Sequence, residues 1–163
     1  MIEAHVPELR RLCQENIRLE AIGDVQSLPT SVQRTLEKVK EETAGNSAMV
    51  LTLALNYGAR TEIVEAVMKV VKEIREGTLH EKDIDEENFP RFLHTSNLPD
   101  PDLLIRTSGE MRVSNFLLWQ IAYAEIWVTD TCWPDFTRRH LMQAIIDFQK
   151  RERRYGGLGD TNS

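Results

Sequence analysis

Two arginines and a serine lie close together just after a short apolar run. Leu103–Ile105 is apolar and bounded by polar residues, which is typical of a buried strand in a parallel sheet. Arg106 follows that strand directly, and Arg112 and Ser114 come shortly after a Ser108-Gly109 turn. Ligands of open α/β sheets bind beyond the carboxyl ends of strands, and guanidinium groups chelate phosphate oxygens. The spacing therefore predicts a phosphate or diphosphate site at this strand end.

A helix predicted over residues 115–122 would add to this site, because a helix N-terminus presents free N–H groups and a partial positive charge. Ser114 has a second interpretation as the N-cap of that helix, and the two roles are compatible. Taken singly, an arginine is more often a surface or ion-paired residue than a ligand. Glu110 is equally suited to pair with Arg106 or with Arg112.

Helices and strands alternate along the whole sequence. Apolar periodicity and the positions of Pro and Gly predict these elements. The predicted helices cover residues 3–16, 29–44, 61–76, 86–93, 115–122 and 137–155, and the predicted strands cover 17–22, 49–55, 103–105 and 125–128. Such alternation implies an α/β fold with a mostly parallel sheet flanked by helices. We expect a single domain over residues 1–157 and a flexible polar tail over 158–163.

Composition narrows the class of protein. A chain of 163 residues with 41% apolar and 28% charged residues is sufficient for one globular core. The net charge of −6 argues against a general role in binding nucleic acid. No apolar run approaches the ~20 residues that span a bilayer, and the polar N-terminus does not resemble a signal peptide. Cys13 and Cys132 are too few for a disulfide framework or a metal site, so we expect a cytoplasmic location.

Several blocks of the sequence match one family in the same order. They are Asn56–Ile63, Arg106–Gln120, Tyr123–Glu125, Trp133–Phe136 and Arg151–Gly157. These blocks resemble the signature of the cis-prenyltransferases, the undecaprenyl diphosphate synthase family, and they cover nearly the whole chain. Ala59 replaces a glycine of the family pattern, and Met111 stands where some relatives carry a polar or metal-coordinating residue.

The resemblance implies a site for isopentenyl diphosphate. Arg106, Arg112, Val113 and Ser114 match the positions that bind this substrate. Glu125 matches the glutamate that helps to hold Mg²⁺ on the diphosphate, and magnesium does favour carboxylate and phosphate oxygens. We expect Glu125 at or near the same sheet edge as the arginines. Its alternative role is a plain buried ion pair with an arginine.

The family motif D-G-N-G-R-W is absent from this sequence, as are the segments that bind the allylic substrate. The resemblance therefore covers the C-terminal portion of such an enzyme, and no catalytic residue is assigned to this chain. It implies an isoprenyl transferase that joins isopentenyl diphosphate to an allylic diphosphate, with Mg²⁺, as a homodimer. It also implies peripheral membrane contact through the lipid product. We expect the chain alone to be inactive.

Three classes of function stay open at this point. The chain is either part of an active enzyme or a non-catalytic subunit that completes the active site of a partner chain. An unrelated phosphate-binding domain is the third, remote alternative.

For the block Asn56–Arg60 we favour a structural role, a turn with Gly58 in an unusual conformation and Arg60 tied to a carboxylate. Arg151 is either part of a solvated helix end or, by resemblance, of a tail that reaches the partner's site.

Overall fold

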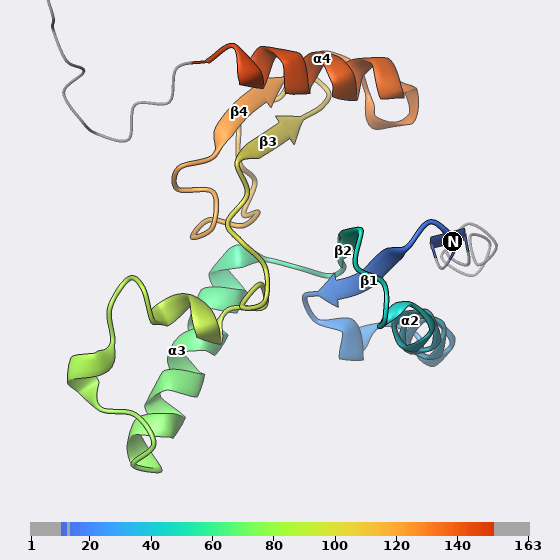
Figure 1. Cartoon of the computed structure of the whole chain (residues 1–163). Coiled ribbons are helices and arrows are strands. Elements are labelled where there is room, and N and C mark those ends of the chain that lie inside the picture. Colours follow the sequence, from blue (N-terminus) through green and yellow to red (C-terminus); the bar gives the residue numbers. More distant parts are fainter. Residues whose placement is uncertain (1–10, 13, 152–163) are drawn as a thin grey trace, which may run out of the picture. The chain divides into compact units, whose positions relative to one another are not determined.

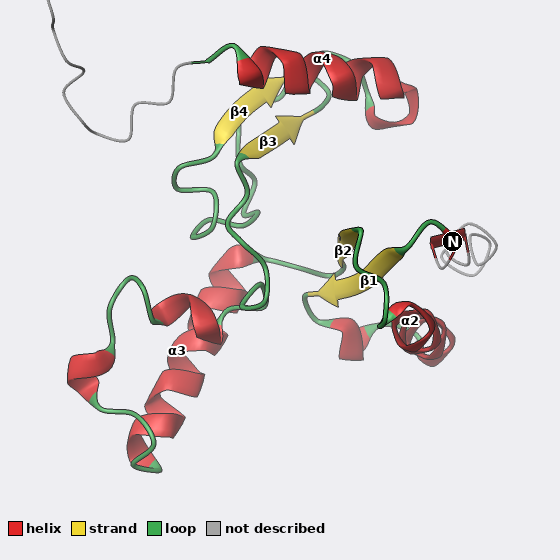
Figure 2. Ribbon diagram, viewed as in Figure 1, coloured by secondary structure: helices red, strands yellow, loops and turns green. Residues whose placement is uncertain are grey.

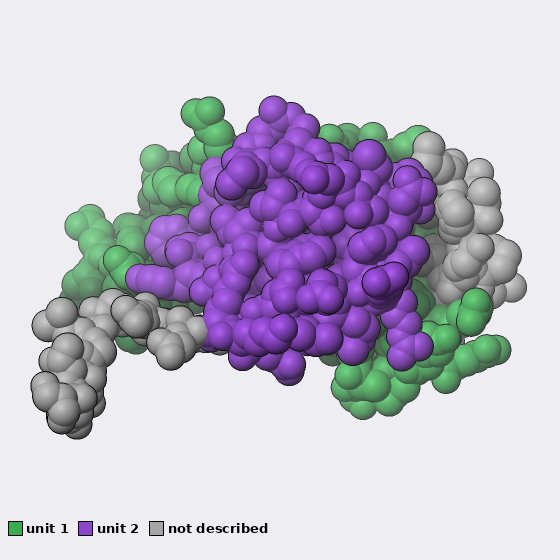
Figure 3. Space-filling view, turned by 90° about the horizontal axis from the view of Figure 1, so that it is seen from above, with its two compact units in different colours: residues 1–99, 115–117 green, residues 100–114, 118–163 purple. Residues whose placement is uncertain are grey.

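The computed structural model describes residues 11–12 and 14–151. Residue contacts divide the chain into two compact units, which Figure 3 colours separately. Unit 1 comprises residues 1–99 and 115–117, and unit 2 comprises residues 100–114 and 118–163. Most of the helix predicted over residues 3–16, the end of the one predicted over 137–155 and the tail 158–163 lie outside the described residues. The single domain over 1–157 stays a prediction, and each unit is described by itself.

Unit 1 contains a parallel strand pair covered by a helix. β1 (Ile17–Ile22) pairs with β2 (Met49–Ala54), and α2 (Thr30–Thr43) packs beside β1 (Figure 1). Leu19, Leu36 and Val39 are at most 2% exposed and form the core of this layer. Each such side chain contributes about 1.5–3 kcal/mol by leaving water. The predicted strands and the predicted inward face of the helix are confirmed here.

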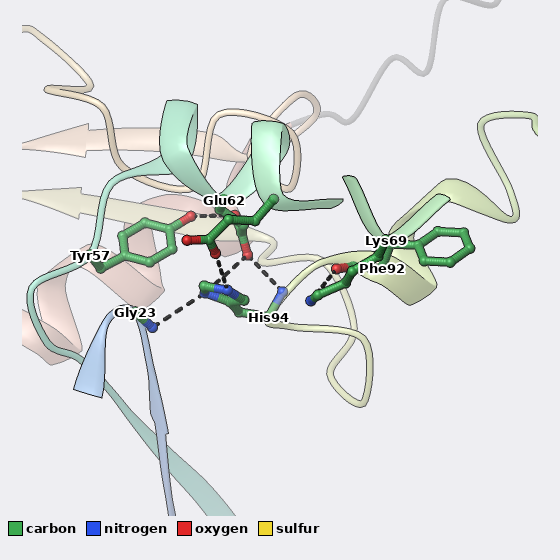
Figure 4. Close-up of polar contacts among 7 residues, drawn as sticks. Gly23, Tyr57, Glu62, Lys69, Phe92 and His94 are labelled. Atoms are coloured by element: carbon green, nitrogen blue, oxygen red, sulfur yellow. Dashed lines mark hydrogen bonds and ion pairs between the residues drawn. The ribbon is translucent and has the colours of Figure 1, made fainter. Parts of the chain in front are cut away.

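The helix α3 (Ala59–Arg75) is tied to its surroundings through a buried carboxylate (Figure 4). Glu62 is 1% exposed, and it accepts hydrogen bonds from the Tyr57 hydroxyl at 2.6 Å and from the His94 backbone N–H at 2.8 Å. The Gly23 N–H donates to Nδ1 of His94 at 3.3 Å, and Nε2 of His94 lies 3.1 Å from Glu65. A buried carboxylate needs such partners, since its desolvation is otherwise costly. This network links α3 to the end of β1 and to the segment around His94.

The N-terminus of α3 is capped by a residue from far along the chain. The Ala59 N–H donates to the Asn115 carbonyl, and the Arg60 N–H donates to Asn115 Oδ1, both at 2.9 Å. A Cβ at Gly58 would lie 2.9 Å from Asn115 Nδ2, so a larger residue there would displace the Asn115 side chain. The expected unusual conformation of Gly58 is wrong, since its φ of −149° is extended. Among the described residues Arg60 has no carboxylate partner, so that expectation is wrong as well.

We predict that Asn115→Ala lowers the free energy of unfolding by about 1 kcal/mol, the usual loss for a helix N-cap side chain. The side chain accepts the Arg60 amide, whereas the Asn115 carbonyl bond survives the substitution. Urea denaturation followed by circular dichroism measures the change. Asn97→Ala, at an exposed asparagine of unit 1, is the control and should leave the stability unchanged. A stability of Asn115→Ala equal to that of the unsubstituted chain would contradict the capping role.

Unit 2 contains a second parallel strand pair. β3 (Leu103–Arg106) pairs with β4 (Glu125–Val128), and α4 (Arg138–Gln149) lies across one face of the pair (Figure 1). The Trp127 indole N–H donates to Asp147 of α4 at 3.0 Å. This bond, followed by one from Gln143, holds the pKa of Asp147 below its ordinary value. The α/β class with parallel strands flanked by helices is thus confirmed, and the four strands within the described residues form two two-stranded sheets.

Short 3-10 turns complete the description of the fold. They cover Val25–Ser27, Glu81–Asp83, Phe89–Phe92 and Trp133–Asp135. The third of these lies where a short helix was predicted over residues 86–93. Among the described residues no helix is long and apolar enough to cross a membrane.

The helix predicted over residues 115–122 is wrong. The segment between β3 and β4 consists of turns and bends (Figure 2). Ser114, Asn115 and Leu117 have φ angles of 52°, 61° and 46°, which lie outside the right-handed helical region. Asn115 also uses its carbonyl and side chain on the start of α3. This long-range contact outweighs the local helix propensity, which is a weak determinant.

Candidate functional site

The face of the β3–β4 pair that bears Arg106 holds a cavity. Residues two apart on a strand share a face, and the parallel register places Leu104 opposite Ile126 and Arg106 opposite Val128. These four side chains, together with residues 110–113, line a cavity of about 220 Å³. Trp127 lies on the opposite face of β4, and its side chain contacts α4 instead. The cavity is therefore apolar on the strands and charged where Arg106 meets the loop.

Arg106 has partners on the loop and one unsatisfied donor. Its Nη2 group donates to Glu110 Oε2 and lies 3.4 Å from Ser114 Oγ. Its Nε atom is buried and has no hydrogen-bond acceptor. A buried donor without an acceptor costs about 1–3 kcal/mol, and an added oxyanion is the kind of group that satisfies it. This feature suits Arg106 to an anionic ligand.

Glu110 brings the two arginines together. Arg112 Nη2 lies 2.5 Å from Glu110 Oε1, while Arg106 takes the other carboxylate oxygen. The ion pairing that the sequence allowed for Glu110 is confirmed with both arginines. The two guanidinium groups therefore converge on the two oxygens of one oxyanion. The Arg112 side chain remains 69% exposed, so it is accessible to a ligand.

The other predicted residues on this loop have simpler surroundings. Val113 is half-buried and lines the same cavity as Arg112. Ser114 is exposed and is near Arg106 but does not cap a helix, because no helix follows it. An anion at this loop would therefore be bound by side chains, without the helix N-terminus that the sequence predicted.

Glu125 does not lie with the two arginines. It is the first residue of β4 and pairs with Leu103, whereas Arg106 ends β3 and pairs with Val128. At about 3.3 Å per residue, the two ends of the strand pair are about 10 Å apart. Glu125 accepts a hydrogen bond from Arg151 Nη1 at 2.6 Å. The position expected for Glu125, at the same edge as Arg106, is therefore wrong, and an ion pair with a different arginine is present.

No group of three or more His, Cys, Asp or Glu side chains within the described ranges is arranged to hold a metal ion. Magnesium is commonly bound through one or two carboxylates, with substrate phosphates and water supplying its other ligands. Glu125 offers one such carboxylate, already paired with Arg151. The residues of this chain therefore do not form a metal site by themselves.

Solved structures with a similar fold define the class of protein. Lavandulyl diphosphate synthase from Lavandula x intermedia, solved in complex with dimethylallyl diphosphate, is 36% identical with a TM-score of 0.92. This structural similarity covers 95% of this chain and 68% of the lavandulyl diphosphate synthase chain. A probable undecaprenyl diphosphate synthase from Campylobacter jejuni is 35% identical with a TM-score of 0.81, over 96% of this chain and 71% of the other. The fold is that of the prenyl diphosphate synthases.

The sequence itself then places the chain in one family. Residues 1–156 match the family model described as putative undecaprenyl diphosphate synthase, and the chain belongs to this family of prenyltransferases. Isoprenyl transferases from Bacillus anthracis and Bacillus subtilis are 53% and 48% identical over 92% and 96% of this chain. The chain spans 58% and 59% of the length of these two relatives.

Sequence reasoning missed two long-range contacts. Within unit 1, Asn115 caps the start of α3. Within unit 2, the segment 129–131 beyond β4 accepts the amides of Ser108 and Gly109, which lie between the two arginines in the sequence. This contact with the loop after β3 was predictable, because the segment directly follows a strand that pairs with β3.

Proposed function

We propose that this chain supplies the isopentenyl diphosphate half-site of a cis-prenyltransferase. In this assignment Arg106, Arg112, Val113 and Ser114 bind the diphosphate of the homoallylic substrate. The reaction of the whole enzyme is the condensation of isopentenyl diphosphate with an allylic diphosphate to give a Z-polyprenyl diphosphate. A homodimer, a cytoplasmic location and membrane contact through the lipid product remain predictions.

The observation that carries the proposal is the convergence of two guanidinium groups on Glu110. Each arginine takes a different oxygen of one carboxylate, an arrangement that also suits two oxygens of a diphosphate. The buried Nε of Arg106 adds an unused donor. Charge-assisted hydrogen bonds of this kind are stronger than neutral ones. Membership of the family supports the choice of diphosphate over other oxyanions.

The role of these residues in the reaction is to bind and orient. The diphosphate of isopentenyl diphosphate is retained in the product, so the arginines anchor the nucleophile and do not assist a leaving group. Fixing the alkene against the allylic carbon lowers the entropic part of the barrier. When bound, magnesium would supply charge neutralisation on diphosphate oxygens. The residues that ionise the allylic substrate are not assigned to this chain.

Binding of isopentenyl diphosphate to the chain tests the proposal most simply. Isothermal titration calorimetry is expected to give saturable binding that inorganic pyrophosphate competes away. Absence of saturable binding in the presence of magnesium would remove the support for the half-site.

We also propose that Glu125 contacts the magnesium ion, and that this ion in turn contacts the diphosphate. Glu125→Ala is predicted to weaken isopentenyl diphosphate binding at low magnesium and to recover in part at high magnesium, because the lost ligand acts through the cation. Titrations at several magnesium concentrations measure this dependence.

Arg151→Ala is the matched control for Glu125→Ala, since the two side chains form one ion pair. A metal role requires that the magnesium dependence shift in Glu125→Ala and not in Arg151→Ala. An equal shift in both variants would assign the effect to the ion pair and contradict the metal role.

The second candidate function is a non-catalytic subunit that completes the active site of a partner chain. Arg106, Arg112 and Ser114 are the residues that a chain contributing to a partner's site would need, which supports this alternative. Mixing the chain with a full-length relative distinguishes the two. A subunit role predicts that the chain changes the partner's affinity for isopentenyl diphosphate, and a self-contained fragment does not.

A further inference from the structure

The turn between the two arginines has an unusual backbone. Ser108 and Gly109 have φ angles of 67° and 65°, so two consecutive residues are left-handed. Glycine adopts this region freely, but serine pays a steric penalty there. Such a conformation persists only where the surrounding structure fixes it. Because the turn joins Arg106 to Glu110 and Arg112, whatever fixes it also sets the separation of the two guanidinium groups.

The segment that leaves β4 fixes this turn. The Gly109 N–H donates to the Thr129 carbonyl at 2.8 Å, and the Ser108 N–H donates to the Thr131 carbonyl at 3.0 Å. The Thr129 N–H in turn donates to the Arg106 carbonyl at 2.9 Å, which extends the β3–β4 ladder by one residue. Both turn amides are therefore consumed by protein carbonyls. They are not free to bind phosphate, and their function is to hold the turn.

The side chain of Thr129 shapes the accepting segment. Its hydroxyl accepts a hydrogen bond from the Thr131 N–H at 3.3 Å and donates to the Thr131 hydroxyl at 3.2 Å. Local bonds of this type curl the backbone of Ser and Thr residues. The curl places the carbonyls of both threonines toward Ser108 and Gly109. Asp130 lies between them, and its carboxylate would be 2.7 Å from a Cβ on Gly109, so a larger residue there would displace that carboxylate.

We propose that Thr129 is a positioning residue for the diphosphate site. Its hydroxyl holds the 129–131 curl, the curl holds the left-handed turn, and the turn sets Arg106 and Arg112 at the separation that a diphosphate needs. The proposal rests on the proposed function for its ligand, but the link from hydroxyl to turn is independent of any ligand. Thr129 itself does not touch the substrate.

Two readouts on the intact chain test the proposal. Thr129→Val replaces the hydroxyl with a methyl group of similar size, and Thr129→Ser keeps the hydroxyl. Amide hydrogen exchange reports whether the bonds of Ser108 and Gly109 still form. Calorimetry with isopentenyl diphosphate and with inorganic pyrophosphate measures the affinity of the Arg106 and Arg112 pair for a diphosphate. Thr35→Val, which removes a hydroxyl bonded within α2 of unit 1, is the matched control.

In Thr129→Val we expect the amide hydrogens of Ser108 and Gly109 to exchange faster. We also expect this variant to bind both ligands about three- to tenfold more weakly, which corresponds to the loss of one neutral hydrogen bond. Thr129→Ser should restore both readouts, and Thr35→Val should change neither. Unchanged exchange or unchanged affinity in Thr129→Val overturns the proposal. Thr129→Ser as weak as Thr129→Val also overturns it, because packing of the methyl group would then be responsible. If the unsubstituted chain bound neither ligand, the proposed function would fail, and exchange would still decide whether the hydroxyl holds the turn.

Discussion

Replacing Arg106 with alanine is expected to weaken isopentenyl diphosphate binding by about ten- to a hundredfold. Charge-assisted hydrogen bonds contribute about 1.5–3 kcal/mol each, and about 1.4 kcal/mol corresponds to a tenfold change in affinity. The substitution also removes the guanidinium whose Nε is buried without an acceptor. Calorimetric titration of the chain with isopentenyl diphosphate, at fixed magnesium, measures the change.

Arg112→Ala is expected to behave like Arg106→Ala, because both side chains converge on the same carboxylate. The greater exposure of Arg112 places its loss at the lower end of that range, since water screens its charge. Arg75→Ala, an exposed arginine in the last turn of α3 of unit 1, is the control for loss of a positive charge. Equal affinities of Arg106→Ala, Arg112→Ala and Arg75→Ala would contradict the two-arginine site. The loop would then be a turn stabilised by ion pairs.

The 163 residues taken alone are expected to show no prenyl transfer. The sequence lacks the D-G-N-G-R-W string that the family uses to ionise the allylic diphosphate, and it spans 58% of the length of the first relatives it matches. Without ionisation, the allylic C–O bond does not break at a measurable rate, however well the second substrate is bound. The assay combines the chain with magnesium, farnesyl diphosphate and labelled isopentenyl diphosphate.

The positive control for this assay is a full-length relative, such as the isoprenyl transferase of Bacillus subtilis, which is 48% identical to this chain. Butanol extracts that contain label above a boiled sample would contradict the prediction. They would also mean that residues within this chain ionise the allylic substrate, and the acidic side chains near Arg106 would be the first to substitute.

The regular elements were predictable because local pattern and packing agree in them. The strands around Leu19 and Leu104 and the helix that buries Leu36 have the apolar spacing of the structures they form. A pattern of this kind reports which side faces a core. It does not report which distant residue will compete for a backbone group.

The helix predicted over residues 115–122, which does not form, illustrates such competition. Its residues favour a helix locally, but Asn115 binds the first amides of α3 with its carbonyl and its side chain. That contact joins residues 55 positions apart, and no spacing rule within the segment reveals it. The helix N-terminus predicted at Ser114 is absent for the same reason, so the proposed anion site depends on side chains.

The misplacement of Glu125 was avoidable from the sequence. Glu125 begins its predicted strand and Arg106 follows the end of its own, and parallel pairing puts a beginning and an end at opposite edges. The ion pair of Glu110 was among the stated alternatives, although its sharing by both arginines depends on the left-handed turn at Ser108. The sequence therefore predicted that Arg106, Arg112 and Ser114 lie on one loop, whereas the hydrogen bonds that set their mutual geometry were not predictable from it.

A crystal structure of the chain with isopentenyl diphosphate tests the half-site most directly. We predict diphosphate oxygens within hydrogen-bond distance of the Arg106 and Arg112 guanidinium groups, with the Glu110 carboxylate displaced from at least one of them. The bonds from Ser108 and Gly109 to the segment 129–131 are expected to be retained. A diphosphate bound elsewhere on the chain, with Glu110 still bridging both arginines, would contradict the half-site.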